Sequence, residues 1–351
     1  MAKTKTKQRR YRFSFGPWNI HEGADPFGPD VRKSVTFARK LKVYKKLGFA
    51  GVQFHDDDAV PDLNNLSHRT ILKRAAALGR TLKNNGLVAE FVAPRLWEDP
   101  RTIDGGYTSN SLACRRYAIE RSLTTIDIAH EIGARQIVLW LAREGTYIRE
   151  SKNARLAHEW LLKAINKMLN HHPRIRILIE PKPNEPMDHA YIPTIGHAIA
   201  LAYMTDDPDR VGGLIETAHA LLAGLDPSDE MAFSHHHKKL WSVHLNDQNG
   251  LKFDQDKNFG ANNLRQAFNQ VRVLEEGGFG QNGEMVGLDV KTMRTQKQAK
   301  NTAHLASSKR FFELLLQKVR TFNRKKEAEL IRERDYEGLE RLVITHLLGT
   351  K

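Results

Sequence analysis

Short apolar runs alternate with longer segments of helical periodicity along most of the chain, and this alternation restricts the fold more than any other feature of the sequence. The short runs are rich in β-branched and aromatic residues, as strands are, whereas the longer segments repeat apolar residues with the period of an amphipathic helix. Strands and helices that alternate in this way favour βα units around a parallel sheet. The sequence therefore predicts an α/β fold.

The number of units narrows the fold further. The expected strands are Arg12–Gly16, Gly51–Phe54, Val88–Ala93, Gln136–Trp140, Arg176–Ile179, Val211–Ile215, Leu240–Leu245 and Glu284–Leu288. The expected helices are Val31–Leu47, Ser67–Asn84, Ser111–Ile132, Asn153–Asn170, Thr194–Met204, Pro227–Lys238, Asn262–Leu274 and Gln298–Phe322. Strict alternation of these elements predicts a closed TIM (β/α)8 barrel. An open doubly wound sheet is the alternative, but no glycine-rich phosphate loop follows the first strand.

The last part of the chain, Lys325–Lys351, is highly charged and has helical periodicity. It is long enough to cover one end of the barrel or to embrace a neighbouring subunit. The chain shows no internal repeat and no low-complexity linker. We therefore expect a barrel domain of residues 1–322 followed by a C-terminal helical extension of residues 323–351.

Composition indicates which class of protein this is and in which cellular compartment we expect it. Forty percent of the 351 residues are hydrophobic, which is enough for a sizeable core, but no run approaches the roughly 18 apolar residues of a membrane span. The basic N-terminus lacks the apolar centre of a signal peptide. Cys114 is the only cysteine, which excludes intramolecular disulfides. We therefore expect a cytoplasmic protein.

The formal net charge of +14 raises the question of a polyanionic partner. Clustered Lys and Arg bind nucleic acid because they neutralise phosphates, whereas dispersed charges form a solvated surface. Most basic residues here are dispersed over helix-like segments such as Arg39–Lys46 and Arg69–Lys83. Only the N-terminal arm is a cluster, formed by Lys3, Lys5, Lys7, Arg9 and Arg10. We expect a solvated basic surface and no nucleic-acid partner.

Carboxylates and imidazoles collect where the expected strands end, which is where TIM barrels place their catalytic groups. In chain order they are His55 and Asp56–Asp58 after the second strand, Glu180, Lys182 and Glu185 after the fifth, Glu216 and His219 after the sixth, His244 and Asn246 at the seventh with Asp254 and Asp256 in its loop, and Asp289 and Lys291 after the eighth.

This collection indicates a metal site. Carboxylates at one barrel mouth repel one another and are costly to desolvate unless cations neutralise them. Oxygen-rich sites with an imidazole suit Mg²⁺, Mn²⁺ or Co²⁺. The polar residues at any one strand end have an ordinary explanation; three successive aspartates, for example, also cap helices. Their joint occurrence on five strand ends has no such explanation. We interpret His235–His237 as surface residues, because they lie in an expected helix before the seventh strand, at the opposite end of the barrel.

Five segments form a recognisable pattern: Phe54–Asp58, Asp104–Asn110, Val138–Gly145, Glu180–Pro186 and Lys252–Asp256. The sequence Glu-Pro-Lys-Pro-Asn-Glu-Pro, followed later by Lys-Phe-Asp-Gln-Asp, is highly specific. With these motifs the chain resembles xylose isomerases of the shorter, actinobacterial type over nearly its whole length. The resemblance implies an aldose–ketose isomerase of carbohydrate metabolism, with conversion of D-xylose to D-xylulose by a metal-assisted hydride shift as the expected reaction.

The resemblance also implies roles for individual residues. His55, oriented by Asp58, would assist opening of the cyclic sugar by proton transfer. Lys182 would hydrogen-bond the substrate oxygen at C1, and Trp140 would keep water from the hydride path. The expected substrate-binding residues are Trp18, Trp97, Trp140, Phe27 and Lys291.

Phe27 matches a phenylalanine that reaches into a neighbouring subunit's pocket in this family, although Pro26 is inserted beside it. A phenylalanine in that role implies a homodimer or a homotetramer. The alternative is a loop aromatic that packs locally.

Two divalent cations are implied in the same way, with Mg²⁺, Mn²⁺ or Co²⁺ as candidates. One would polarise the substrate carbonyl and activate a bound water, and the other would hold two substrate oxygens. Their expected ligands are Glu216, His219, Asp254 and Asp256 for the first, and Glu180, Glu216, His244 and Asp289 for the second. His244 stands where the family has an aspartate, so one negative charge is lost. Either the metal preference shifts from Mg²⁺ toward Mn²⁺ or Co²⁺, or the site is weaker.

Other departures from the family pattern lie around the expected pocket. Trp97 replaces a phenylalanine, Pro94 and Arg95 replace small polar residues, Ala220 replaces an acidic residue, and Ser242 replaces a histidine. These changes leave three possibilities: an isomerase of xylose or a related sugar, an isomerase or epimerase of another sugar or polyol-like substrate, and a homologue that binds a metal or sugar without isomerase activity.

Overall fold

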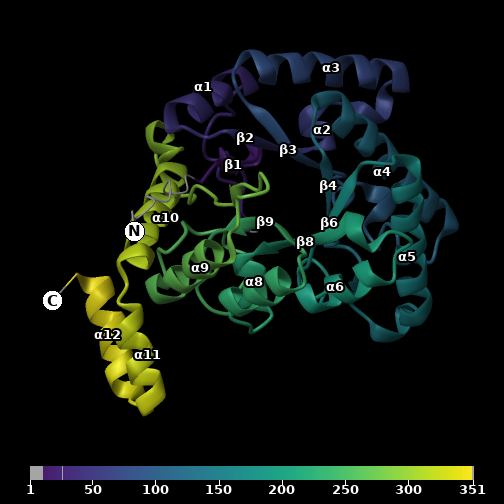
Figure 1. Ribbon diagram of the computed structural model, residues 1–351. Helices are drawn as coiled ribbons and strands as arrows, with labels where there is room; N and C mark the ends of the chain where they lie inside the picture. The colour runs from purple at the N-terminus through teal and green to yellow at the C-terminus, as the bar shows by residue number, and fades with distance from the viewer. Residues whose placement is uncertain (1–10, 26, 350–351) are drawn as a thin grey trace, which may run out of the picture.

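The computed structural model describes residues 11–25 and 27–349, and eight parallel strands in it close into a barrel in the order β1-β10-β9-β8-β6-β4-β3-β2 (Figure 1). The strands are β1 (Phe13–Phe15), β2 (Gly51–His55), β3 (Val88–Ala93), β4 (Gln136–Trp140), β6 (Arg176–Glu180), β8 (Val211–Glu216), β9 (Leu240–Leu245) and β10 (Val286–Leu288). β5 (Gly145–Thr146) and β7 (His189–Ala190) form a separate antiparallel pair. The expected TIM barrel is confirmed.

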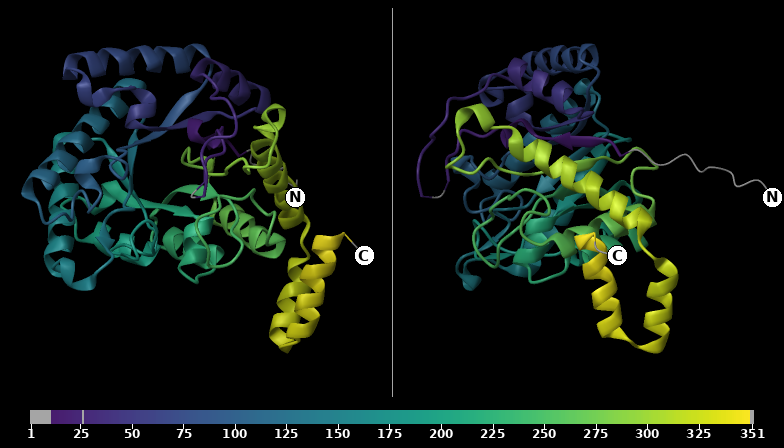
Figure 2. Two further views of the ribbon diagram at one scale, coloured as in Figure 1. Left: turned by 180° about the vertical axis from the view of Figure 1, so that it is seen from behind. Right: turned by 90° about the vertical axis from the view of Figure 1, so that its left-hand side faces the viewer.

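Helices surround the strands on the outside of the barrel, as Figures 1 and 2 show. The longer ones are α1 (Phe37–Leu47), α3 (His68–Asn84), α4 (Leu112–Ile132), α5 (Ala154–His171), α6 (Ile195–Tyr203), α8 (Pro227–His236), α9 (Leu264–Gly277) and α10 (Ala303–Thr321). Two short helices, α2 (Asp56–Ala59) and α7 (Thr217–Leu222), directly follow β2 and β8. Within the described residues, no helix combines the length and the apolar character needed to cross a membrane.

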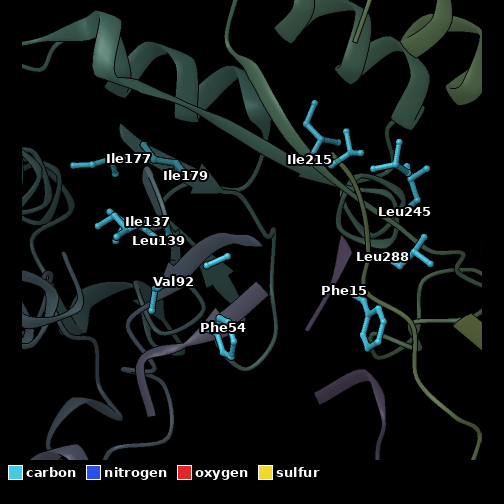
Figure 3. Close-up of a cluster of buried hydrophobic side chains, with 14 of the residues drawn as sticks. Phe15, Phe54, Val92, Ile137, Leu139, Ile177, Ile179, Ile215, Leu245 and Leu288 are labelled. Atoms are coloured by element: carbon cyan, nitrogen blue, oxygen red, sulfur yellow. The ribbon is translucent and has the colours of Figure 1, made fainter. Parts of the chain in front are cut away.

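The barrel wall divides the apolar core into two parts, because successive side chains of a strand point to opposite faces. Val92 and Ile137 belong to the large cluster between strands and helices, together with the other strand residues labelled in Figure 3. Their sequence neighbours Phe91 and Val138 belong to a small separate cluster that contains only strand residues and that Trp18 packs against. This second cluster lies inside the barrel.

The first helix is shorter than its periodicity predicts, since it begins at Phe37 and not at Val31. Arg32 is buried, and its Nη1 donates to the carbonyl oxygens of Met293 at 3.0 Å and Gln296 at 2.8 Å. These contacts hold the segment before α1 against the loop after β10, where it cannot continue the helix.

The last strand also begins later than expected, at Val286. The Glu284 carboxylate accepts hydrogen bonds from the backbone N–H groups of Gly280 and Asn282, both at 3.0 Å. Glu284 therefore closes a turn and is not part of the strand.

The C-terminal segment forms two helices, α11 (Arg324–Glu333) and α12 (Tyr336–Leu348). They separate at Arg334, whose φ of 56° lies in the left-handed region and ends α11. Figures 1 and 2 show them as an antiparallel pair that projects away from the barrel. Its base is joined to α9 by the ion pair of Arg272 with Glu327, at 2.6 Å. The basic arm of Lys3 to Arg10 and Pro26 lie outside the described residues.

Candidate metal centre and active site

A cavity of about 500 Å³ opens at the C-terminal ends of the barrel strands. Ala93, Trp140, Glu180 and Glu216 each end a strand and line it. This end of the barrel is where TIM barrels carry their active sites. Of the candidate site residues, those that line the cavity are Trp18, His55, Trp97, Trp140, Glu180, Lys182, Glu216, His219, His244, Asp254, Asp256, Asp289 and Lys291. None of the residues of α11 and α12 lines it, so these helices do not cover the cavity.

Carboxylate and imidazole atoms approach one another closely on one side of the cavity. They form three groups, in each of which one ligand atom per residue lies within 4.8 Å of the others: Glu180, Glu216 and His219; Glu216, His244 and Asp289; and Glu216, Asp254 and Asp256. Glu216 belongs to all three groups. It ends β8 and pairs in register with His244 on β9, which places it between the other residues.

Three residues of these groups each carry one buried atom without a hydrogen-bond partner: His219 Nδ1, His244 Nε2 and Asp254 Oδ1. Buried polar atoms are nearly always paired, so unpaired ones on three neighbouring residues favour a bound ligand. Imidazole nitrogens and carboxylate oxygens together are the donors that divalent cations such as Mn²⁺, Co²⁺ and Zn²⁺ accept, and carboxylates alone suit Mg²⁺. The residues present therefore fit divalent cations.

Two lysines balance part of the negative charge. Lys182 Nζ donates to Asp254 Oδ2 at 2.9 Å and lies 3.1 Å from Glu185 Oε2, and Lys291 Nζ pairs with Asp256. Burial alone would lower the pKa of each lysine, but the carboxylates raise it above the ordinary value. Burial and the charge of Asp254 nevertheless raise the pKa of Asp256 to about 8. The lysines therefore do not neutralise the cluster fully, and a further cation would stabilise it.

His244 lies among the carboxylates. Its Nδ1 is 3.2 Å from Glu180 Oε1, 3.7 Å from Glu216 Oε2 and 3.8 Å from Asp289 Oδ2. Burial alone would lower the pKa of His244, but the charge and hydrogen bond of Glu180 raise it well above the ordinary value of 6.5. A metal that uses this imidazole must therefore displace a proton.

Aromatic rings line the cavity beside the carboxylates, and Trp18 Nε1 donates to Asp289 Oδ1 at 2.9 Å. The Trp18 ring packs on the His55 imidazole at a centroid distance of 4.2 Å, and Trp97 meets the same imidazole edge-on at 5.1 Å. Trp97 and Trp140 also pack edge to face, 4.5 Å apart, and Lys182 Nζ lies 5.2 Å from the Trp140 ring. An apolar wall therefore runs from His55 to Lys182.

Two candidate residues do not line the cavity. Asp58 Oδ2 lies 2.8 Å from His55 Nδ1. Burial would raise the pKa of Asp58, but the hydrogen bond and charge of His55 and the charge of Arg95 lower it to about 2, so the carboxylate is ionised. The side chain of Phe27 is 83% exposed and meets the Phe253 ring edge-on at 5.8 Å. Its expected contact with a neighbouring subunit stays a prediction.

Two residues outside the predicted ligand set, Asn246 and Glu185, hold candidate ligands in place. Asn246 Nδ2 donates to Glu216 Oε1 at 2.9 Å and to Asp256 Oδ1 at 3.0 Å. The Glu185 carboxylate accepts a hydrogen bond from the backbone N–H of Asp254 at 3.0 Å. Asn246 and Glu185 both lie just after strands, and this position in the sequence indicates a place near the site. Only the tertiary structure shows which residues they contact.

Arg95 lines the cavity next to His55. Its guanidinium lies 2.9 Å from Asp57, 3.1 Å from Asp58 and 3.3 Å from Glu98. The ligand atoms of His55, Asp57 and Asp58 lie within 4.8 Å of one another, but Arg95 already supplies a cation to both aspartates. We therefore place no metal in this group.

His235–His237 contribute nothing to the cavity wall. His235 and His236 are exposed at the C-terminal end of α8, just before β9 begins. This is the end of the barrel opposite to the cavity.

Comparison with known proteins agrees with the fold. Residues 41–300 match the family described as "Xylose isomerase-like TIM barrel". A xylose isomerase of Thermus thermophilus is 35% identical over 274 residues, which cover 77% of this chain and 70% of that protein.

Solved structures give the same architecture at lower identity. An L-ribulose 3-epimerase superposes with a TM-score of 0.63 at 14% identity, over 92% of this chain and 98% of that one. A D-tagatose 3-epimerase-like protein does so with a TM-score of 0.65 at 14% identity, over 88% and 99%. At such identities the likeness concerns the fold alone. The family match over most of the chain and the identity to the Thermus thermophilus protein show that the chain is a divergent member of the xylose isomerase-like TIM barrel family.

Proposed function

We propose that the protein is a divalent-metal-dependent aldose–ketose isomerase that converts D-xylose to D-xylulose. The observation that carries the proposal is the cluster around Glu216, three residues of which carry an unpaired buried atom, beside a cavity of about 500 Å³. The Thermus thermophilus relative is named xylose isomerase. The two similar solved structures are named as a sugar epimerase and an epimerase-like protein, so isomerisation or epimerisation of sugars is the chemistry that these names share.

We assign two divalent cations, Mg²⁺, Mn²⁺ or Co²⁺, to the cluster. The ligands would be Glu216, His219, Asp254 and Asp256 at one position, and Glu180, Glu216, His244 and Asp289 at the other. Cations bound there would polarise hydroxyl and carbonyl oxygens of the sugar and hold it in place. Glu216 would bridge the two positions, in keeping with its place in all three groups of ligand atoms.

The side chains of the cavity would perform the remaining steps. Lys182 would donate a hydrogen bond to the oxygen at C1 and stabilise its developing charge while hydride passes between C1 and C2. Trp140 would exclude water from that path, and Trp18 and Trp97 would pack on the apolar face of the sugar. His55, oriented by Asp58 at 2.8 Å, would assist opening of the cyclic sugar by proton transfer at the ring oxygen and the anomeric hydroxyl. Lys291 would contact substrate beside Asp256.

A second candidate is an isomerase or epimerase of another sugar or of a polyol-like substrate. Arg95 and Trp97 favour it, because both line the cavity next to His55. They change the shape and the charge of the wall at the place where the anomeric end of the sugar would bind. A homologue that binds metal and sugar without turnover is the third possibility that an assay must separate.

Parallel assays of the purified protein test the proposal. Xylose and a panel of other pentoses, hexoses and ketoses would each be incubated with Mg²⁺, Mn²⁺ and Co²⁺, with chelator-treated protein as control. Metal-dependent formation of xylulose from xylose supports the proposal. Turnover of another sugar alone favours the second candidate, and metal binding without turnover of any sugar rejects an enzymatic function.

We also propose that the protein works as a homodimer or homotetramer, with residues 1–322 as the catalytic domain and residues 323–351 as an extension that contacts a neighbouring subunit. The exposure of Phe27 beside Phe253 supports this, because Phe253 lies in the loop that carries Asp254 and Asp256. A neighbouring subunit would cover this aromatic pair.

A further inference from the structure

A polar group inside the barrel, beside the metal-ligand cluster, has no part in the proposed function. Its centre is the buried carboxyl of Glu90. This carboxyl accepts hydrogen bonds from Ser242 Oγ at 2.9 Å, from Gln53 Nε2 at 3.1 Å and from Ser14 Oγ. Burial raises the pKa of Glu90 above the ordinary value, although these hydrogen bonds and the charge of His244 oppose the shift. Glu90 therefore lies close enough to His244 for their charges to interact.

A β-bulge directs Glu90 into the barrel. Val52 pairs with Ala89 and Gln53 pairs with Phe91, so the register between β2 and β3 shifts by one residue and Glu90 has no partner on β2. In a regular strand, one of the two neighbours Glu90 and Phe91 would point outward. Here Phe91 belongs to the cluster inside the barrel, and the Glu90 carboxyl reaches side chains of β1, β2 and β9.

The Glu90 carboxyl determines which end of the Gln53 amide faces it. An ionised carboxylate only accepts hydrogen bonds, so the amide presents its NH2 group to Glu90 Oε2. A proton on Glu90 Oε1 would not change this, because Oε2 would still accept. Gln53 Nε2 also donates to Ser14 Oγ at 3.2 Å, which uses its second hydrogen. Gln53 Oε1 is left free, and it is buried without a hydrogen-bond partner.

The edge of the His244 ring that carries Nε2 lies next to Gln53. His244 pairs in register with Gly287 on β10, which has no side chain to separate the two residues. Gln53 Nε2 and His244 Cδ2 lie 2.5 Å and 3.2 Å from the point that a Cβ on Gly287 would occupy. Cδ2 is bonded to Nε2, whereas Nδ1, on the other side of the ring, faces Glu180. His244 Nε2 is buried and, like Gln53 Oε1, has no hydrogen-bond partner.

We propose that Gln53, oriented by Glu90, is a positioning residue for the metal centre, and that its Oε1 accepts the hydrogen of His244 Nε2. The inference rests on the proposed function in one respect, that His244 is a metal ligand. An imidazole that binds a cation through Nδ1 carries its hydrogen on Nε2. An acceptor for that hydrogen fixes the ring and makes the ligand nitrogen more basic. Gln53 offers a free acceptor on that side of the ring, so the two unpaired atoms satisfy each other when a cation occupies Nδ1.

A double-mutant cycle tests whether Gln53 acts through His244. Mn²⁺ binding would be measured by titration calorimetry on the full-length wild type, Gln53→Met, His244→Asp and the protein with both changes. We expect Gln53→Met to weaken binding at the position that contains His244 by about 10–100-fold, as loss of such an outer partner does. His244→Asp has no ring N–H to donate, so adding Gln53→Met to it should change the affinity little. An unchanged affinity in Gln53→Met, or an equal loss in both backgrounds, would overturn the proposal.

Two variants of Glu90 separate its hydrogen bond from its charge, and they decide the question even if Gln53→Met does not fold. Glu90→Gln and Glu90→Met both remove the negative charge, but only Glu90→Gln keeps an acceptor for the Gln53 amide. Mn²⁺ should therefore bind more weakly to Glu90→Met than to Glu90→Gln, and the difference should vanish when His244→Asp is added to each. Denaturant unfolding would show that the variants are folded. Equal affinities of Glu90→Gln and Glu90→Met would show that Glu90 does not orient Gln53.

These titrations need no sugar, so their result is separate from that of the isomerase assays. A wild type that binds Mn²⁺ and converts no sugar would reject the proposed function, and the cycle would still decide on Gln53. A wild type that isomerises xylose and shows equal losses in both backgrounds would support the proposed function and reject the role of Gln53. A wild type that binds no Mn²⁺ would overturn both.

Discussion

At the scale of single residues, Glu216 is the position on which the candidate metal centre depends most. It is buried, and burial raises the pKa of its carboxyl well above the ordinary value even though His219 opposes this. Such a carboxyl gains most from a cation beside it. Asn246 fixes one of its oxygens, which leaves its orientation little freedom.

We predict that Glu216→Gln abolishes turnover and weakens metal binding at both positions. The amide keeps the size of the side chain but removes its charge. Loss of residues that merely orient metal ligands typically costs 10–100-fold, so loss of a bridging ligand should lower activity by more than about a hundredfold. Metal titration calorimetry and kcat would measure the effects. Glu98→Gln is the matched control, since Glu98 lines the cavity outside the three groups, and its metal affinity should stay near that of the wild type. Normal turnover in Glu216→Gln would contradict the assignment.

Lys182→Met should separate catalysis from metal binding. The change removes a donor to developing charge and no ligand, so we expect kcat to fall by roughly a hundred- to a thousandfold. Metal affinity should be equal or higher, because Asp254 loses the ammonium that competes for its Oδ2. Calorimetry and steady-state kinetics on the same preparation would show both effects. A variant with wild-type kcat would disprove the role of Lys182.

His244→Asp should improve Mg²⁺ affinity, because it restores a hard anionic ligand and one negative charge. In the wild type, the raised pKa of His244 means that the imidazole is protonated over a range that extends above pH 6.5. Metal binding must release that proton, so wild-type affinity should fall as the pH drops through the raised pKa, at a higher pH than an ordinary histidine would give.

Titrations of the wild type and of His244→Asp with Mg²⁺ and Mn²⁺ between pH 6 and 9 would test this. The aspartate variant should show a weaker pH dependence and a smaller preference for Mn²⁺. Equal Mg²⁺ affinities with the same pH dependence would show that His244 is not a ligand.

At the scale of elements, the turn from β2 into α2 holds His55 in place through a buried ion pair. Asp56 is buried, and Arg121 on α4 donates to both of its carboxylate oxygens at 2.8 Å. Thr125, one turn further along α4, donates to Asp56 as well, at 3.1 Å. The strand end that carries His55 is thereby tied to the helix layer.

Arg121→Met should therefore destabilise the protein strongly. It leaves the Asp56 carboxylate buried without a cation, and breaking a buried pair in this way costs about 3–5 kcal/mol of unfolding free energy. Denaturant unfolding would measure the loss. The control is Arg155→Met on α5, whose exposed pair with Glu159 should contribute little. A loss no larger than that of the control would contradict the prediction.

At the scale of the whole molecule, α11 and α12 are helices that do not belong to the barrel. Ile331, Ile344 and Leu348 are 50%, 44% and 72% exposed on these helices. Apolar side chains gathered on a projecting pair of helices are typical of a surface that another chain covers. The other side of the pair is attached to the barrel, by Arg272 with Glu327 at 2.6 Å and Arg265 with Glu340 at 2.8 Å.

Deletion of residues 323–351 should therefore lower the oligomer mass and leave the barrel folded. Light scattering after size exclusion would give the mass, and circular dichroism would report the fold. The double variant Ile331→Lys and Ile344→Lys keeps the helices and should lower the mass in the same way. An unchanged mass in both proteins would show that the extension does not hold subunits together.

Local pattern was enough to predict the barrel and the end of it at which the candidate site lies. The strands Val88–Ala93, Gln136–Trp140 and Leu240–Leu245 have the bounds that the sequence predicts. Periodicity determines which segments are strands, and in a parallel barrel all strands end at the same mouth. Glu180 and Glu216 end β6 and β8. The sequence alone therefore predicts that polar residues at these strand ends lie in one cavity.

Only the tertiary structure decided how individual side chains pair within that frame. Arg95 follows β3 and His55 ends β2, and no sequence pattern states that a guanidinium from one lies against the imidazole of the other. Arg32, which shortens α1, is bound by carbonyls about 260 residues away in the chain. Such contacts depend on closure of the barrel and on side-chain length and direction, which are not periodic. Local periodicity thus determined the barrel and its mouth, whereas long-range contacts between side chains decided the chemistry that each residue presents there.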